Sequence, residues 1–145
     1  MTDTTESLKT LHTGLVDTRH GYEEALADAH GGDLSGLFRQ MIALHADGAR
    51  ETERLLRARG VAVDDAGSFM TTVHRTVMDV RSMITGLGEN IIPQLVSGEQ
   101  HNLDKYDAAL ASGVGAAERE ALGAHRAKLT DAMAGMKAIE AAATK

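Results

Sequence analysis

The sequence has no cysteine and no tryptophan, a single proline, and aromatic residues at only 3% of its 145 positions. Because cysteine is missing, disulfide bonds and thiolate metal sites are excluded. Runs of alternating β-branched and aromatic residues, which strands usually require, are also missing. Ala, Leu, Met, Glu and Arg, which favour helices, are common instead. The composition therefore predicts an all-α protein.

Three further absences bear on where the protein acts and on its partners. No apolar run approaches the ~20 residues that a membrane span requires. The first ten residues, MTDTTESLKT, lack the basic and then apolar stretches of a secretory signal. The net charge of −6 disfavours a nucleic-acid partner, which would require a basic face. We therefore expect a cytoplasmic protein with neither a membrane nor a nucleic-acid partner.

Apolar residues recur at spacings of three and four, as they do along one face of an amphipathic helix. The first such stripe includes Leu8, Leu11 and Leu15. The pattern predicts four long helices, at about 5–29, at about 34–58, at about 90–111, and from the SGVG turn to about 143. A shorter helix is predicted at about 68–85. Gly60 is expected to end the second long helix.

Two short sequences 84 residues apart are nearly the same, YEEALA beginning at Tyr22 and YDAALA beginning at Tyr106. Each lies late in a predicted helix that precedes a glycine turn and another long helix. A histidine follows in each returning helix, His45 in the first copy and His125 in the second. We interpret the repeat unit as an αα-hairpin. One hairpin leaves its apolar face in water, whereas two hairpins packed together bury it.

Two hairpins joined by a long crossover form the ferritin-like arrangement of a four-helix bundle. The crossover is long enough to run back along the bundle, so the helices predicted at about 34–58 and at about 90–111 can be parallel neighbours. The hairpin repeat, the crossover and the segment SGEQHNLDKYDAALASG resemble an uncharacterised bacterial family of ferritin-like four-helix-bundle proteins. The resemblance covers about 8–139 and implies the fold but no established activity. The expected organisation is one domain over 1–145, with hairpins at about 5–59 and 90–143 and a crossover helix at about 68–85.

Ferritin-like carboxylate proteins hold two iron or manganese ions with a Glu from each of two helices and a Glu-x-x-His motif from each of the other two. Ile42 and Leu122 stand where those motifs would have their glutamates, which argues against a dinuclear site here. A simpler site for one iron, manganese or zinc ion remains an alternative. Its candidate ligands are Glu23 or Glu24 in the first helix, Glu99 or Asp107 in the fourth segment, and His45 and His125 in the returning helices.

The same residues have a second interpretation that needs no metal. Tyr22 and His45 are predicted at nearly the same height in the first hairpin, and Tyr106 and His125 in the second. A hydroxyl and an imidazole can satisfy each other's hydrogen bonds in a dry core. Glu99 lies on a core stripe and then needs a partner, because an unpaired buried acid is unfavourable. The candidate partners are His45, His125, Asn102, water or a metal ion.

Two further groups of residues give predictions about packing. Four histidines match no second-ligand pattern, and we expect them at the surface or near a helix or chain terminus: His12, His30, His74 and His101. Glycine is unfavourable inside a helix unless a neighbouring backbone or side chain approaches closely. Helix-contact positions are therefore predicted at Gly14, Gly21, Gly48, Gly98, Gly123 and Gly135.

No nucleophile–base pair, phosphate loop or nucleotide fingerprint is present. This favours a protein that acts by binding or assembly rather than as an enzyme. The alternative is a metal-binding protein with a redox role. Met70, Met78 and Met83 of the crossover helix are first interpreted as core-filling residues. The alternative is that they give the crossover helix an adaptable apolar face that contacts a second subunit in a homodimer. The methionines also leave open an apolar ligand held between the hairpins.

Overall fold

The computed structural model describes residues 3–29, 35–62 and 92–143. The secondary structure in these ranges is helical. The helices are α1 (Thr4–Ala29), α2 (Ser35–Ala58), α4 (Ile92–Ala111) and α5 (Ala116–Ala143). The predicted bounds of the four long helices agree with these to within two residues. The predicted crossover helix at 68–85 lies outside the described residues, as do His30 and His74.

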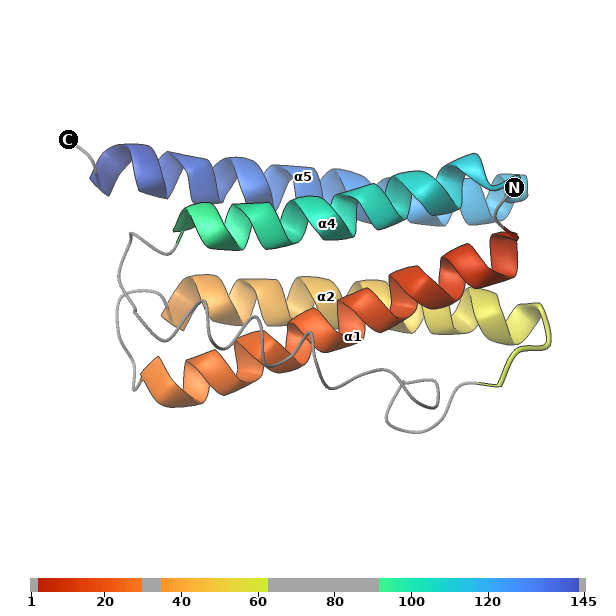
Figure 1. Ribbon diagram of the computed structural model, residues 1–145, viewed down its shortest axis with the longest axis horizontal. Coiled ribbons are helices and arrows are strands. Elements are labelled where there is room, and N and C mark those ends of the chain that lie inside the picture. The colour runs from red at the N-terminus through yellow and green to blue at the C-terminus, as the bar shows by residue number, and fades with distance from the viewer. Residues whose placement is uncertain (1–2, 30–34, 63–91, 144–145) are drawn as a thin grey trace.

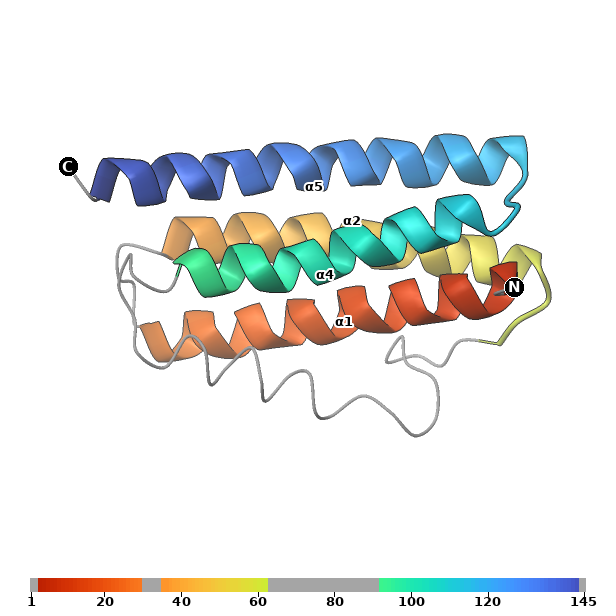
Figure 2. The same cartoon turned by 45° about the horizontal axis from the view of Figure 1, so that its top comes forward.

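The four helices form a bundle in which each helix has two main neighbours (Figures 1 and 2). α1 packs against α2 and α4, and α5 packs against the same two helices. α1 and α5 run in one direction along the bundle, and α2 and α4 run in the other (Figure 1). The predicted parallel orientation of α2 and α4 is therefore present, but the two helices lie across a diagonal rather than side by side.

Glycines with left-handed backbone end two of the helices. Gly60 has a φ of 83° and Gly113 a φ of 94°, a region that other residues rarely adopt. After α2, the Val61 N–H donates to the Leu56 carbonyl at 3.0 Å, which satisfies one of the free carbonyls of the last turn. Gly60 therefore ends α2 as predicted, and Gly113 ends α4.

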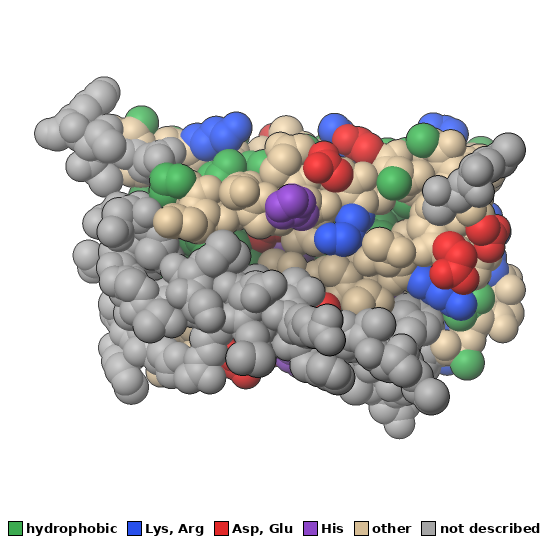
Figure 3. Space-filling model, viewed as in Figure 1, with side chains coloured by type: hydrophobic (Ala, Val, Ile, Leu, Met, Phe, Trp, Pro, Cys, Tyr) green, Lys and Arg blue, Asp and Glu red, His purple; other side chains and the backbone are tan. Residues whose placement is uncertain are grey.

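The ends of the bundle are joined by polar contacts between helices. At the start of α1, the Thr4 hydroxyl donates to the Ser112 carbonyl at 2.6 Å. Arg59 donates two hydrogen bonds to the Glu118 carboxylate, at 2.6 and 2.7 Å, which connects the end of α2 to the beginning of α5. Elsewhere on the surface, acidic and basic side chains are interspersed over the coloured part of the face that Figure 3 shows.

The apolar core draws on every helix, and its largest fully buried side chains include Leu8, Phe38, Ile92 and Leu129. Two helical glycines let neighbours approach closely. A Cβ at Gly14 would lie 3.0 Å from Asn102 Oδ1, and one at Gly48 would lie 2.8 Å from the Tyr106 hydroxyl. These two glycines are confirmed as contact positions.

The same prediction fails for two glycines of α5. A Cβ at Gly123 or Gly135 would meet nothing within 4 Å. Packing within the described chain therefore gives no reason for glycine at either position.

Candidate functional site

Glu99 is the centre of a buried polar network. On α4 it follows Ile92 and Leu95 at helical spacing and precedes Tyr106, so the same stripe that carries the apolar side chains turns Glu99 into the bundle. Its exposed fraction is 1%. A carboxylate at such a position requires hydrogen-bond donors from its neighbours.

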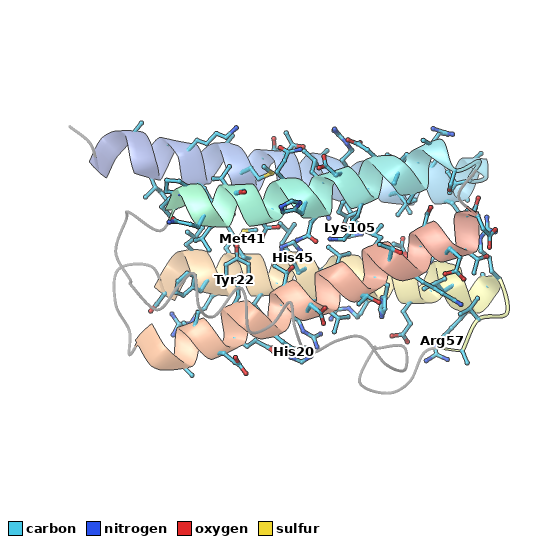
Figure 4. The ribbon with its side chains drawn as sticks, viewed as in Figure 1. His20, Tyr22, Met41, His45, Arg57 and Lys105 are labelled. Atoms are coloured by element: carbon cyan, nitrogen blue, oxygen red, sulfur yellow. The ribbon has the colours of Figure 1, made fainter. Side chains whose placement is uncertain are left out.

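Three side chains supply those donors. The Tyr22 hydroxyl on α1 donates to Glu99 Oε2 at 2.8 Å, and His45 Nε2 on α2 donates to the same oxygen at 2.8 Å. Asn102 Nδ2 donates to Oε1 at 3.1 Å. The Tyr22 and His45 rings stack with centroids 6.1 Å apart, and both lie inside the bundle (Figure 4). One carboxylate thus joins three helices.

These contacts decide the charge of the network. Burial raises the pKa of Glu99, but the charge interaction with His45 and the hydrogen bonds from His45, Asn102 and Tyr22 together outweigh it and hold that pKa below its usual range. Burial, together with the negative charge of Glu99 and the hydrogen bond to it, raises the pKa of Tyr22 well above its usual range. Tyr22 therefore stays a neutral donor, and Glu99 is the anion.

The network extends to Thr18 through Asn102. Asn102 Nδ2 donates to Thr18 Oγ1 at 3.0 Å, and Thr18 Oγ1 donates to the Gly14 carbonyl at 2.7 Å. Thr18 and Asn102 are 84 residues apart, which is also the offset between Tyr22 and Tyr106. Equivalent positions of the two repeats therefore contact each other, as residues near a two-fold axis do.

The two copies of the repeat differ in chemistry on either side of the Thr18–Asn102 contact. The residue equivalent to Glu99 in the first repeat is Leu15, which is fully buried. Leu15 and the Tyr106 hydroxyl both lie close to Gly48, so Tyr106 has an apolar neighbour where Tyr22 has a carboxylate. Burial and the charge of Glu99 raise the pKa of Tyr106. The network around a buried carboxylate therefore forms at Glu99 and has no equivalent at Leu15.

A second buried polar pair joins α1 to α2. His12 is 1% exposed, and its Nδ1 lies 2.9 Å from Thr52 Oγ1. The Thr52 hydroxyl donates its hydrogen to the Gly48 and Ala49 carbonyls, so its oxygen accepts from His12 Nδ1–H. The expected surface position of His12 is wrong, whereas His101 is exposed as predicted. The missed signal is that His12 follows Leu8 by four residues and lies beside the Leu11 and Leu15 stripe.

The chain was compared with models of known protein families. A family model described as "Domain of unknown function (DUF2383)" matches residues 3–112, which include α1, α2, α4 and every residue of the Glu99 network. The chain belongs to the DUF2383 family. No curated protein and no solved structure matches it. None of the helices in the described part of this DUF2383 protein is long and apolar enough to cross a membrane.

Of the predicted metal ligands in this DUF2383 chain, the structure brings together only His45 and Glu99. Glu23 is at the surface, where it lies 3.2 Å from His20 Nδ1. Asp107 is also at the surface and accepts from Arg126 Nε at 2.5 Å. These two acids hold equivalent places in the repeat, and both point away from the core. Over residues 3–29, 35–62 and 92–143, no three His, Asp or Glu side chains are grouped closely enough to share one metal ion.

His125 does not join the network. It is half-buried on α5 near Asp47 and Glu51 of α2, and its Nδ1 has no hydrogen-bond partner among the residues that the structure describes. Burial lowers the pKa of His125, as does the nearby Lys128 charge, while Glu51 and Asp47 partly oppose this. The predicted pair of His125 with Tyr106 is absent from the described hydrogen bonds. The predicted pair of Tyr22 with His45 is present, but Glu99 connects the two rings.

Replacing Thr18 with valine tests how much the outer part of the network contributes. Thr18→Val keeps the shape of the side chain but removes the oxygen that accepts from Asn102. We expect the free energy of unfolding to fall by about 1 kcal/mol, the net value of a buried hydrogen bond. Urea denaturation followed by circular dichroism measures the change. Thr130→Val on the exposed side of α5, which loses a hydrogen bond to the Arg126 carbonyl, is the matched control and should change stability by less than half as much.

Proposed function

We propose that this DUF2383 protein is a ferritin-like bundle that acts by binding or assembly and is not an enzyme. The observation that carries the proposal is that the hydrogen bonds of the Glu99 carboxylate are all made to side chains within the protein. Both of its oxygens accept from side chains of the protein, and 1% of the residue is exposed. A carboxylate in this state ties helices together and leaves little capacity for a substrate.

The ferritin-like assignment is supported by helix directions and by the repeat. α1 and α5 run opposite to α2 and α4, as required when two antiparallel pairs are joined by one long crossover (Figure 1). The contact between Thr18 and Asn102, at equivalent positions of the two repeats, is what a two-fold relation between hairpins predicts. The network then holds one hairpin against the other across the centre of the bundle.

One observation favours metal binding as a second candidate function. The Tyr22 hydroxyl and His45 Nε2 both lie 2.8 Å from the same oxygen of Glu99. A phenol, an imidazole and a carboxylate are all ligand types for iron, manganese or zinc. A cation could replace the protons that now hold these three groups together, with small movements of the side chains.

Metal loading distinguishes the two candidates. The protein, purified without an affinity tag, is incubated with Fe²⁺, Mn²⁺ or Zn²⁺, desalted, and assayed for metal content and melting temperature. For a binding or assembly protein we expect less than about 0.1 equivalent of metal per chain and an unchanged melting temperature, because a ligand that binds the native state would raise it.

The opposite result has its own controls. About one equivalent of metal, lost in Glu99→Gln but kept in Glu23→Gln and Asp107→Asn, would replace the first candidate with the second. The two surface variants remove acids that are exposed and paired with cationic side chains or His20, so they leave the buried network intact.

A further inference from the structure

Between residues 121 and 138, the exposed side of α5 next to α2 carries a stripe of small residues and two charged residues. Ala124, Gly135 and Ala138 on this side are exposed, and Ala121 is half-buried. α5 lies along the edge of the bundle, and no other described helix covers this side (Figure 2). Small side chains permit another helix to approach closely. The surface stripe, at alternate spacings of three and four, consists of Ala121, Ala124, Lys128, Asp131, Gly135 and Ala138.

The two charges of the stripe have no ion-pair partner in the described part of the chain. Lys128 and Asp131 are exposed, three residues apart, and both line an open hollow between α5 and α2. Leu44 of α2 and Ala132 also line it, so an apolar floor lies beside a cation and an anion. A partner for this surface should place an anion against Lys128 and a cation against Asp131.

A second copy of the same stripe, packed antiparallel to the first, meets that requirement. In an antiparallel pair of α5 helices with a two-fold axis between 129 and 130, Lys128 of each copy faces Asp131 of the other. Ala124 then faces Gly135, and Ala121 faces Ala138. A two-fold interface requires such self-complementarity, because the same patch serves on both sides. The order of small and charged residues along α5 therefore identifies the partner as a second copy of this chain.

Gly135 supports the same partner independently. Glycine inside a helix is less favourable than alanine. A Cβ there would meet nothing within 4 Å in the described part of the chain, so the packing of these residues does not require the glycine. A second helix at this side would need it, since the backbones come closest where side chains are smallest.

We propose that the chain forms a two-fold dimer through antiparallel packing of α5 against α5 of a second copy, with reciprocal Lys128–Asp131 ion pairs at its centre. This rests on the proposed role in assembly and specifies the surface and the partner. It differs from the expected dimer through the crossover helix, because the residues that carry it lie on α5.

Charge exchange on the full chain tests the interface, with sedimentation velocity at a series of concentrations giving the dimer dissociation constant. Lys128→Glu and Asp131→Lys each place like charges in contact twice, and we expect each to weaken the dimer about tenfold. The double variant restores opposite charges with reversed polarity and should return to near the wild-type constant. Lys137→Glu is the matched control, because Lys137 lies eleven residues after Arg126, on the side of α5 that faces α4.

Gly135→Leu and Gly123→Leu form a second pair of variants. Both positions have open space in the protomer, but only Gly135 belongs to the stripe. We expect Gly135→Leu to abolish the dimer and Gly123→Leu to leave it unchanged, with equal helical content by circular dichroism.

A wild-type chain that stays monomeric, or charge variants with unchanged dimerisation, would overturn the α5 interface. A dimer that resists all these variants would still leave assembly in place, whereas stoichiometric metal uptake would remove the proposed function itself.

Discussion

Replacing His45 with phenylalanine should lower the free energy of unfolding by about 3–5 kcal/mol at neutral pH. The substitution removes the donor to Glu99 Oε2 and the charge interaction that helps to keep the carboxylate ionised in the core. The remaining anion is buried with too few partners. Urea denaturation measures the loss. His125→Phe is the control, because His125 is half-buried and outside the network, and it should change stability by less than about 1 kcal/mol.

The loss in His45→Phe should also depend on pH. In the wild type the pKa of Glu99 is lowered on folding, so its contribution is present above the unfolded value near 4.5 and is lost as pH falls through the native value. Without His45, burial dominates and raises the pKa of this carboxyl. The variant is then penalised at neutral pH and relieved as Glu99 takes up a proton. The gap between the two proteins should therefore shrink as the pH falls from 7 towards 4.5. A constant gap over that range would mean that the charge of Glu99 does not matter.

Gly48→Ala should lower the free energy of unfolding by about 1–2 kcal/mol, although alanine favours a helix more than glycine does. The new methyl group would lie 2.8 Å from the Tyr106 hydroxyl and 3.1 Å from Leu15 Cδ1, so two buried side chains must move. Thermal or urea denaturation measures the effect. Gly36→Ala, on the same helix with nothing within 4 Å, should cost nothing.

A double-mutant cycle identifies the contact responsible. In the Tyr106→Phe background the hydroxyl is gone, and Gly48→Ala should lose most of its penalty. An equal penalty in both backgrounds would show that Leu15 or the backbone, rather than the Tyr106 hydroxyl, limits the space at Gly48.

The helix bounds could be predicted because each helix carries a regular apolar stripe and two of them end at a glycine with positive φ. Gly60 and Gly113 have the left-handed backbone expected after a helix. The diagonal placement of α2 and α4 could not be predicted, since an apolar stripe indicates that a side is buried but not which helix covers it.

The sequence predicted some residues of the Glu99 network but not all of them. The spacing of Glu99 with Ile92 and Tyr106 placed the acid in the core, and two of the partners considered for it, His45 and Asn102, are confirmed. Thr18 was missed, although it continues the Leu8, Leu11, Leu15 and Tyr22 stripe, because threonine gives no strong signal of either burial or exposure.

The repeat itself caused the main error. Similar sequences suggested that His125 would have the role of His45 and that Asp107 and Glu23 would face inward. Because Leu15 occupies the place of Glu99 in the other repeat, the second half has no acid for a histidine to bind. A duplicated backbone therefore does not imply a duplicated site, and single substitutions in the stripe decide which copy carries polar chemistry.

The Glu99 network includes side chains from α1, α2 and α4, and no side chain of α5 takes part in its described hydrogen bonds. α5 is held by apolar packing through residues such as Leu122 and Met136, and by ion pairs at the surface. The Glu99 carboxylate therefore joins three of the four described helices, and the attachment of α5 depends on its apolar packing and surface ion pairs.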